Sequence, residues 1–453
     1  MVSSALTSPM HGSLTLSTLI PAPTDAGMGM AMIRQAFNRL WNDKRGNVLV
    51  IAGMAMPLLF GSVGLATDTV QWALWKRQLQ RSADSAAYSG VYARFQAASS
   101  TTAANAVVTR DLTNAELTSA LRSGFPLVTQ PVDVTPFTNT VEVAIEAQRS
   151  LIFSSMFMSS APIIRVTARA ASAPNGVFCA YAKEDTNVSG IIIQGSANVN
   201  LGCGMISNSR SASVSVGVNG TAHNVTAEPV AGVGGVPQIN GVTREQSYHL
   251  PQLDPLENRY NTTVPAGMTC TNMASKIVST SGSTTTLRPG CYTGSNQFRF
   301  NGSGTTVLQP GTYYLNNTDF TATGGTITGT GVTIILTGTS PGQMNMNGGA
   351  TLQLSAPTAV GHPYRNLLIM QSPTASNINN SNTINGSATS SFDGTVYFPN
   401  QELTFSGSSA AATKCVLVVA RRLNFAGNAN IQNNTTGCMA NETITGQIIR
   451  LIA

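Results

Sequence analysis

Residues 287–313, LRPGCYTGSNQFRFNGSGTTVLQPGTY, carry the repeat that indicates the fold of this chain. The stretch opens with the box Leu-x-Pro-Gly-x-Tyr, and the same box returns 21 residues later at its end. Between the two lies a second box, an apolar residue followed by x-Gly and two small or polar residues. A period of about 20 residues suits one coil of a parallel β-helix. The second box occurs six times, with the apolar residues Ile193, Phe300, Met346, Ile384, Phe405 and Phe425.

These repeats predict a mainly β domain over residues 173–453, a right-handed parallel β-helix or similar solenoid. The apolar residue of each box would point inward, and its glycine would supply the positive φ that a corner needs. Gly, Ser, Thr and Asn are abundant, but short apolar runs interleave with them, which favours short strands over disorder. We expect the longer runs to line the core: Val332–Leu336, Asn366–Met370 and Cys415–Val419. An antiparallel β-sandwich is the alternative.

A membrane segment precedes the repeats. Residues 48–67, VLVIAGMAMPLLFGSVGLAT, contain no charged side chain. Twenty helical residues span about 30 Å, the thickness of one hydrocarbon core. A buried helix of a soluble protein and a signal peptide are the alternatives. Few soluble helices stay apolar all round over this length, however, and no clear small-x-small cleavage site precedes Asp68. We therefore expect an N-terminal transmembrane helix that acts as an anchor.

Basic residues on the two sides of this segment indicate its orientation. The cluster before it is nearer and denser than the cluster after it, and the denser cluster stays in the cytoplasm. We expect a single-pass protein of the bacterial inner membrane, with a cytoplasmic N-terminus and a periplasmic C-terminal domain. The first cluster is Arg34, Arg39, Lys44 and Arg45, and the second is Lys76, Arg77 and Arg81.

Four segments are expected along the chain. Residues 1–43 match no structural element or targeting signal, and Met28, Met30 and Met32 are alternative starts. We expect this stretch to be a cytoplasmic lead that is disordered or reflects too early a start. Residues 44–110 would form the membrane helix and its continuation, residues 111–172 a small α/β juxtamembrane module, and residues 173–453 the solenoid. In the module, residues 132–137, 140–147 and 161–171 read as strands, and residues 150–158 as a helix or a buried run.

The net charge of +6 is concentrated near the membrane segment. Through residue 110 the chain has nine Lys and Arg against four acidic residues, so only one positive charge remains for the rest of the chain. This clustering sets membrane orientation, and it makes no basic groove with interleaved aromatic side chains. We therefore expect no nucleic-acid partner.

Six cysteines all follow the membrane segment. An even number on one side of a membrane suits disulfides in an oxidising compartment, although reduced, buried cysteines are the alternative. Sequential pairing would close three short loops, but six cysteines allow 15 pairings, so the connectivity stays open. None lies in a C-x-x-C motif, which argues against zinc. The cysteines are Cys179, Cys203, Cys270, Cys291, Cys415 and Cys438.

Residues 44–93 resemble the TadE/TadG-like proteins of tight-adherence (Flp-type) pilus assembly. The resemblance rests on Arg45-Gly46 before the apolar span, Asp68 at its end, and a helix that continues into the small-residue run 83–87. Small side chains let a partner helix approach closely, although a solvated helix with a modest apolar stripe is the alternative. The expected helix-interaction residues are Arg45, Gly46, Asp68, Arg77, Leu79, Ala83, Asp84, Ala86 and Ala87.

The resemblance is closer to the larger, uncleaved TadG-like branch than to pilin-like members. Pilin-like members that a prepilin peptidase cuts have Glu five residues after the glycine, whereas Ile51 stands there in this chain. Many TadG-like members carry a D-x-S-x-S metal motif, and this sequence has none. Residues 179–182, the stretch around Cys203, the Leu-x-Pro-Gly-x-Tyr boxes and residues 394–407 also look like the periplasmic domain of this group.

Candidate chemistry in the solenoid is sparse. The close acid pairs, Glu184–Asp185 and Asp254 with Glu257, lie in polar, loop-like sequence, where solvated charges are the usual case. The histidines form no metal-ligand spacing. We therefore expect no catalytic residue, cofactor or metal site. We expect a structural component of pilus assembly, with the inner membrane and other pilus-assembly or pilin-like membrane proteins as partners. The alternatives are an envelope adhesion protein that binds glycan or a cell surface, and, third, a glycan-active β-helical enzyme.

Overall fold

The structure is a computed structural model, and it describes residues 38–39, 47–220, 223–272, 277–294, 298–375, 382–385, 389–406, 410–427, 430–434 and 444–452. Its helices are α2 (Asn47–Phe95) and α3 (Ser100–Asn114), with the 3-10 turns η1 (Thr118–Ala120) and η2 (Ser154–Met156). The chain forms two compact units. The first holds α2 up to Ser82 with residues 110–126 and 144–166, and the second holds residues 83–109, 127–143 and all that follows Val166.

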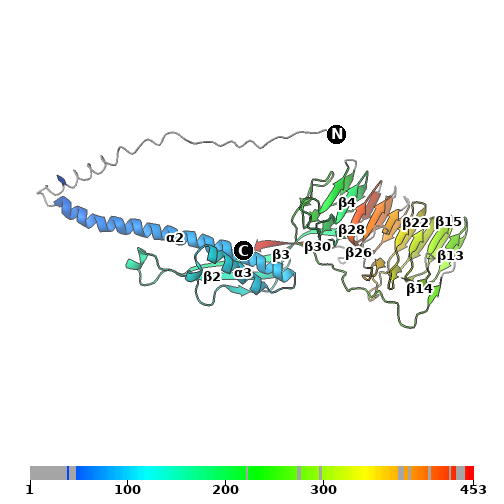
Figure 1. Cartoon of the computed structure of the whole chain (residues 1–453), viewed down its shortest axis with the longest axis horizontal. Coiled ribbons are helices and arrows are strands. Elements are labelled where there is room, and N and C mark those ends of the chain that lie inside the picture. The colour runs from blue at the N-terminus through cyan, green and yellow to red at the C-terminus, as the bar shows by residue number, and fades with distance from the viewer. Residues whose placement is uncertain are drawn as a thin grey trace, which may run out of the picture. The chain divides into compact units, whose positions relative to one another are not determined.

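Parallel strands of the second unit stack into a solenoid with three strips, each strip taking one stretch of strand from each coil (Figure 1). Strip 3 has nine strands, so the described residues form about nine coils.

The strands of strip 1 are β11 (Cys270–Asn272), β14 (Gly290–Thr293), β17 (Gly311–Asn316), β20 (Val332–Thr337), β23 (Leu367–Gln371), the first halves of β26 (Thr395–Ser406) and β28 (Val418–Phe425), the end of β3 (Ile164–Ala182), β6 (Gly204–Ser207), β9 (Val230–Gly232) and β10 (Glu245–Gln246). Strip 2 comprises β12 (Ile277–Ser279), β15 (Arg299–Gly302), β18 (Phe320–Ala322), β21 (Met344–Met346), β24 (Asn382–Asn385), the second halves of β26 and β28, β4 (Ile191–Gln194) and β7 (Val216–Asn219). Strip 3 comprises β13 (Thr284–Leu287), β16 (Thr305–Leu308), β19 (Gly325–Thr330), β22 (Ala350–Ser355), β25 (Ser391–Asp393), β27 (Ala410–Lys414), β29 (Asn430–Asn434), β5 (Asn198–Asn200) and β8 (Asn224–Thr226).

One interior column explains the short repeat box. All six apolar box residues are buried, and strand register places them in a single file along strip 2. The box glycines Gly195, Gly302 and Gly427 adopt positive φ, as predicted, whereas Gly348 does not. Gly386 and Gly407 lie outside the described residues. Stacked aromatic rings such as Phe405 and Phe425, with centroids 5.6 Å apart, fill a core that has few large residues. In register order the file reads Val218, Ile193, Phe425, Phe405, Ile384, Met346, Ala322, Phe300 and Ile277.

The coils do not stack in the order of the sequence. The chain enters the solenoid in mid-stack, at residues 178–200, and makes its next coils toward one end. It then crosses to the other end, at residue 270, and winds back until β28 and β29 dock on the coil where the chain entered. Figure 1 shows the result as green strands around β4 beside the orange and red strands β26 and β28. The solenoid is therefore wound as a permuted chain.

The crossing segment, residues 247–269, is called the strap. It covers the outer face of strip 1, where Leu256 and Tyr260 pack in a second apolar cluster with strand residues such as Ile335 and Met370. Strands of strip 1 are therefore buried on both faces, which explains why β20 and β23 read as almost unbroken apolar runs. Polar contacts fix the strap as well: Thr337 donates to the carbonyl of Thr262 at 2.6 Å.

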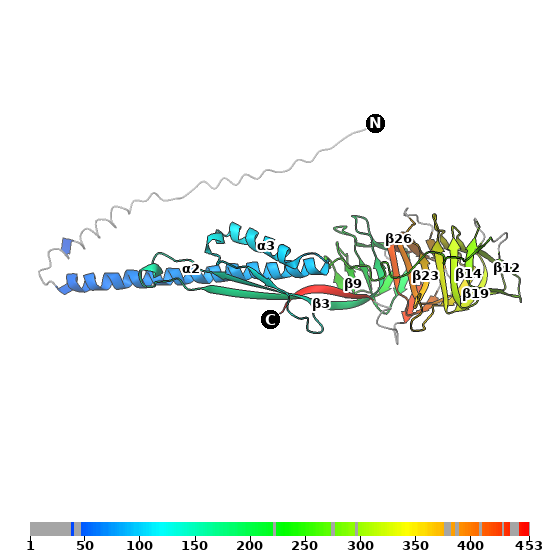
Figure 2. The ribbon, with the colours of Figure 1, turned by 90° about the horizontal axis from the view of Figure 1, so that it is seen from below.

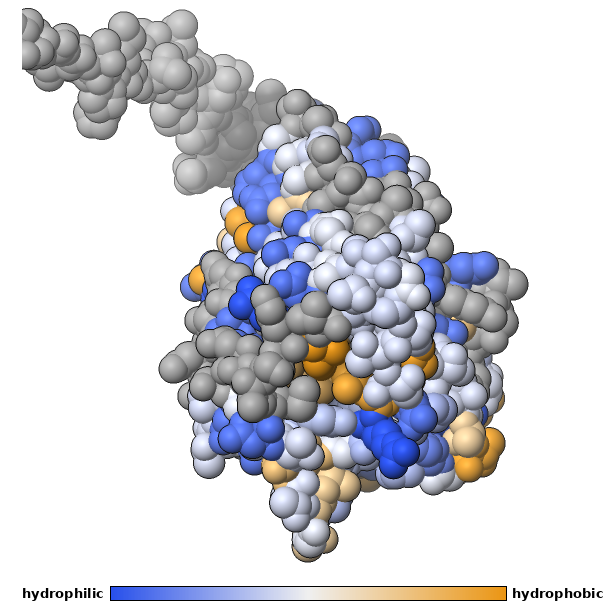
Figure 3. Space-filling view, turned by 90° about the vertical axis from the view of Figure 1, so that its right-hand side faces the viewer, coloured by the Kyte–Doolittle hydropathy of each residue, from blue (hydrophilic) through white to orange (hydrophobic). Residues whose placement is uncertain are grey.

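Polar strands cap the far end of the stack. At the far end β11 and β13 have the polar sequences CTN and TTTL, as the capping coil of a solenoid requires. Figure 3 looks onto this end and shows mostly hydrophilic and pale atoms with small apolar patches. The chain leaves the solenoid beside the strand by which it enters, since residues 169–178 of β3 pair antiparallel with β30 (Ile444–Ile452), as Figure 2 shows.

The predicted β-solenoid is confirmed, and the β-sandwich alternative is wrong because all strand pairings within the coils are parallel. In residues 111–172, strand β2 (Thr138–Ala147) matches the predicted strand at 140–147, and β1 (Leu127–Thr129) is an addition. Residues 132–137 are no strand, since Asp133 there accepts the backbone N–H groups of Asn139 and Thr140 instead. Residues 150–158 were expected to form a helix or a buried run, but they form only the 3-10 turn η2, and most of their side chains are exposed.

Candidate functional site

Helix α2 exposes apolar side chains over its first half. Among the described residues it is the one helix long and apolar enough to cross a membrane. The exposed side chains lie all around the helix, which is the pattern of a helix in lipid and not of one in a soluble core. They include Val50, Ile51, Met54, Met56, Leu58, Leu59, Phe60 and Val63.

A stripe of buried positions also runs along this helix, and from Leu79 onward its members recur at spacings of three and four residues. Most of its members are small, so neighbouring segments can approach the helix backbone closely. A side chain at Gly90, for example, would meet Val141 of β2 at 2.8 Å. The buried positions are Gly64, Asp68, Leu79, Ser82, Ala83, Ala86, Ala87, Gly90, Val91 and Ala93.

The structure places most of the predicted helix-interaction residues. Leu79, Ala83, Ala86 and Ala87 are fully buried by this chain, so their face is not open to a partner helix. Arg77 is exposed and Asp84 is half-buried, so neither belongs to the buried stripe. Arg45 and Gly46 lie outside the described residues.

Asp68 is the charged member of the buried stripe. Its side chain is 6% exposed, and its Oδ2 accepts the backbone N–H of Ser154 at 2.6 Å. A buried carboxylate needs such donors, because burial without them is costly. Asp68 therefore fixes the segment around η2 to the point where the apolar span ends.

A second carboxylate, Glu146, lies just before the same segment and forms ion pairs. Its side chain is 8% exposed and pairs with Arg122 at 2.7 Å and with Arg165 at 2.6 Å. Close by, the side-chain amide of Gln148 donates to the carbonyl of Ala161 at 2.8 Å. Residues 148 and 161 are thus held together, and the residues between them form a closed loop.

An open groove of about 500 Å³ lies between this loop and α2. Its walls combine the Asp68 carboxylate with Gln71, Trp75 and Phe153. The guanidinium of Arg149 lies 5.8 Å from the centre of the Trp75 ring, a cation–π distance. Sequence reasoning missed Ser154, Glu146 and Arg149. The sequence feature that could have drawn attention to this region is the absence of any charged residue from position 150 to position 164.

Disulfides join neighbouring coils of the solenoid. Cys179–Cys203 links the coil where the chain enters to the next one, and Cys270–Cys291 links the two coils at the far end. Their Cα atoms are 5.9 Å and 4.4 Å apart. Cys415 is also disulfide-bonded, and Cys438 lies outside the described residues.

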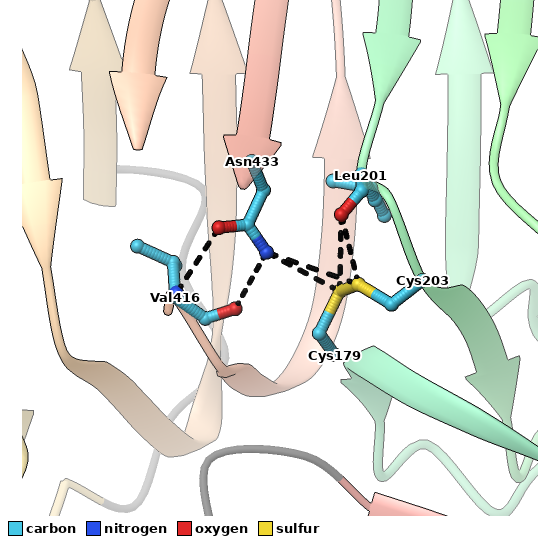
Figure 4. The surroundings of a disulfide bond; sticks show 5 residues. All are labelled: Cys179, Leu201, Cys203, Val416 and Asn433. Carbon is cyan, nitrogen blue, oxygen red and sulfur yellow. Dashed lines mark hydrogen bonds between the residues drawn. A yellow bond between two sulfur atoms is a disulfide. The ribbon is translucent and has the colours of Figure 1, made fainter. Parts of the chain in front are cut away.

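Asn433 connects the returning coil to the first disulfide. In Figure 4 its side chain points from β29 toward the sulfur atoms, with the amide nitrogen 3.6 Å from Sγ of Cys179. The same amide bonds both the N–H and the carbonyl of Val416. The disulfide therefore lies at the junction between the first and last parts of the solenoid sequence.

The acid pairs that were expected to be solvated are partly buried, which corrects that expectation. Glu184 has no exposed surface and pairs with Arg421 at 3.2 Å and Arg422 at 2.8 Å, both on β28. Burial alone would raise the pKa of Glu184, but hydrogen bonds from Thr186 and Arg422 hold the pKa below its ordinary value. Glu184 stands in loop-like sequence, yet its ion pairs join the coil where the chain enters the solenoid to strand β28.

Asp254 of the strap is the second buried acid. Its side chain is 3% exposed, pairs with Lys183 at 2.6 Å and accepts the hydroxyl of Tyr397 at 2.8 Å. Burial and the nearby Asp254 carboxylate raise the pKa of the Tyr397 and Tyr181 hydroxyls, so both remain hydrogen-bond donors. Within the described part of the chain, no group of three or more His, Cys, Asp or Glu side chains could hold a metal ion.

Comparison with known proteins gives one match. Residues 46–99 match the model of the Flp pilus-assembly TadE/G-like (Tad) family. No curated protein and no solved structure matches the chain. The matched residues include the exposed apolar half of α2, Asp68 and the buried stripe. Residues 46–99 are therefore a TadE/G-like segment, and the resemblance of this chain to the TadE/TadG-like family is confirmed.

Proposed function

We propose that this protein is a membrane-anchored structural component of tight-adherence (Flp-type) pilus assembly. The observation that carries the proposal is the coincidence of two features: the family match covers residues 46–99, and the same residues form the one described helix that could cross a membrane. A helix of this kind can both anchor the chain and meet other membrane helices.

We further propose that the N-terminus is cytoplasmic and the solenoid periplasmic. The nearer and denser basic flank before residue 48 supports this orientation. The disulfides Cys179–Cys203 and Cys270–Cys291 support it independently, because such bonds persist in an oxidising compartment.

Partner helices would contact the exposed face of α2. The alanines of the small-residue run 83–87 are covered by this chain, whereas positions such as Met54, Leu58 and Phe60 are exposed and free to meet lipid or another helix. The role is proposed as structural, not catalytic, because the buried acids Glu184 and Asp254 are held in ion pairs with basic side chains of the solenoid.

The test is electron microscopy of surface filaments in a clean deletion strain, with surface attachment assayed in parallel. We expect the deletion to remove filaments, and the full-length gene to restore them. A gene that lacks residues 44–93 should not restore them. Normal filaments in the deletion strain would refute the assembly role.

One observation favours envelope adhesion as a second candidate. Strand register on strip 3 aligns Thr284, Thr305, Thr326 and Thr351 in an outward-facing ladder of hydroxyl groups. Regularly spaced hydroxyls on a flat strip can hydrogen-bond the hydroxyls of a glycan. Glycan-array binding by the whole protein, lost when Thr305 and Thr326 are replaced by valine, would support adhesion. Binding unchanged by these substitutions would remove the ladder as its site.

A further inference from the structure

The loop at residues 150–164 is apolar and faces outward. Its sequence, SLIFSSMFMSSAPII, contains no charged residue. A soluble protein rarely exposes so many large apolar side chains together, and such a cluster marks a contact with another apolar phase or molecule. The exposed members are Ile152, Phe153, Met156, Phe157, Met158 and Ile163, with exposures from 40% to 75%.

This loop lies on the part of α2 that is proposed to cross the membrane. Phe153 packs on Gly64, where an added side chain would come within 2.5 Å of the phenyl ring. Phe157 reaches Gly61, with its ring 3.7 Å from the position of an added Cβ. Both glycines belong to the uncharged span 48–67. The exposed apolar surface of the loop is thus continuous with that of the helix.

Along α2, the polar contacts of the loop lie C-terminal to its contacts with the two glycines. Ser154 is bound to Asp68, the first charged residue after the span, and Arg149 lies over Trp75. Trp75 and Gly61 are separated by about 21 Å of helix, at 1.5 Å per residue. Along this length the partners of the loop change from a cation–π pair, through a carboxylate, to glycines within the span. Aromatic rings and basic residues at the headgroup level, with apolar side chains deeper, form the pattern of an interfacial anchor.

We propose that residues 150–164 insert into the outer hydrocarbon layer of the same membrane, so that the chain has a second membrane contact beside α2. The occupant of the apolar face is the acyl chains of the lipid. This proposal rests on the proposed membrane anchoring, because the depth of the loop is set by its contacts with Gly61, Gly64 and Asp68. The loop does not cross the membrane, since the hydrogen bond from Gln148, just before the loop, to Ala161, near its end, brings the chain back to the side from which it starts.

Lipid crosslinking in cell membranes tests the proposal. A photoreactive benzoyl-phenylalanine replaces Phe157, Met54 or Val360 in the full-length protein, and mass spectrometry detects lipid adducts after illumination. Met54 is exposed within the span, and Val360 is an equally exposed residue of the solenoid. We expect lipid adducts at positions 54 and 157 and none at position 360. Adducts at position 54 alone would overturn the loop insertion and leave the anchoring intact. Absence of adducts at position 54 would refute the anchoring itself.

A matched pair of glycine substitutions tests the docking. Gly64→Leu would displace Phe153, whereas Gly53→Leu meets nothing within 4 Å. We expect Gly64→Leu to reduce the adduct yield at position 157 severalfold and to leave position 54 unchanged, while Gly53→Leu changes neither. Equal yields at position 157 in the two variants would overturn the proposed docking of the loop on α2. Formation of the Cys179–Cys203 disulfide in both variants shows that the solenoid has folded.

Discussion

At the residue scale, the contacts that the sequence alone did not reveal are those of buried charged side chains. Glu184 and Asp254 stand in polar sequence, and local pattern predicts solvated side chains there. Glu184 pairs with arginines of β28 that lie more than 200 residues away. Asp254 pairs with Lys183, about 70 residues earlier, and with Tyr397 of β26, more than 100 residues later. Asp68 was singled out from the sequence, but its partner is a backbone N–H of Ser154, which no sequence pattern marks. Burial of a charge depends on tertiary partners, so these contacts could not be predicted from local pattern.

Glu184→Gln should destabilise the solenoid. Breaking a fully buried ion pair costs about 3–5 kcal/mol, and we expect about 2–3 kcal/mol because the two arginines keep some exposure. The folded-state pKa of Glu184 is lowered, so its stabilisation is present above the unfolded-state pKa and is lost as the pH falls through the folded-state pKa. Urea unfolding at neutral pH should therefore give a lower free energy of unfolding for the variant than for wild type. This difference should narrow as the pH falls below 4.5, the ordinary pKa of a glutamate, and through the lowered folded-state pKa of Glu184. Glu257→Gln, at an exposed residue, is the control. A difference in the free energy of unfolding between wild type and Glu184→Gln that does not change with pH would contradict the ion-pair assignment.

Asp68→Ala should loosen the loop around Ser154. A buried hydrogen bond to a charged acceptor contributes about 1.5–3 kcal/mol, so amide exchange in residues 150–158 should accelerate more than tenfold. Hydrogen–deuterium exchange of the protein in lipid nanodiscs measures this rate. Thr69→Ala is the matched control, because the Thr69 hydroxyl bonds only the carbonyl of Leu65 in its own helix. Equal exchange in the two variants would show that Asp68 does not hold the loop.

At the element scale, the repeat predicted the coils but not their order. The box spacing and the alternation of apolar and polar residues are local, so the parallel strands and the inward position of residues such as Phe300 follow from the sequence. The docking of β28 on β3 and β4 joins segments more than 200 residues apart, and no local period encodes it. Local pattern was also insufficient for residues 150–158. The apolar run there predicted a helix or a buried run, but most of its large side chains are exposed.

Phe425→Ala should cost as much stability as Phe300→Ala. Phe425 pairs with Ile193 across the junction of the permuted coils, and Phe300 lies between coils that are consecutive in sequence. Both side chains are fully buried, so each truncation should cost about 3–5 kcal/mol. Thermal unfolding followed by circular dichroism compares the two variants. A destabilised Phe300→Ala with a near-normal Phe425→Ala would show that the junction is not part of the cooperative core.

At the scale of the whole molecule, the permuted winding lets the solenoid begin and end at one place. Residues 169–178 and β30 run side by side, so both ends of the solenoid sequence leave through one pair of strands. The strap makes this possible by carrying the chain along the stack to the far end. Closing contacts of such long sequence separation costs loop entropy, and folding through them is slow. The disulfide Cys179–Cys203 and the hydrogen bond from Tyr181 of β3 to the strap carbonyl of Gln252 stabilise the coil on which the last strands dock.

A rearranged chain tests this winding. It begins at Val242, runs to Asn434, continues through a short Gly/Ser link into Val177 and ends at Gly241. Since β29 lies beside β5, the link replaces an ordinary corner between coils, and we expect the rearranged chain to fold. Formation of Cys179–Cys203 and Cys270–Cys291 with a cooperative thermal transition would show this, and residues 177–434 in native order are the control. A native-order chain that folds beside a rearranged chain that does not would contradict the coil order.

The central claim is that the TadE/G-like segment acts in filament assembly and does more than anchor the solenoid. Its most direct test replaces the lipid-facing residues of α2 by leucine while Gly61, Gly64 and Asp68 are kept. Such a helix stays apolar and membrane-bound but loses the shape that partner helices would recognise. The residues to replace are Val50, Ile51, Met54, Met56, Phe60 and Val63.

The measurement is the number of surface filaments per cell in a strain that carries this variant as its sole copy. We predict that the variant remains in the membrane with its disulfides formed and that filaments are lost, whereas the wild-type gene in the same strain restores them. Filaments in normal number, with the variant present in the membrane at the wild-type level, would contradict the claim.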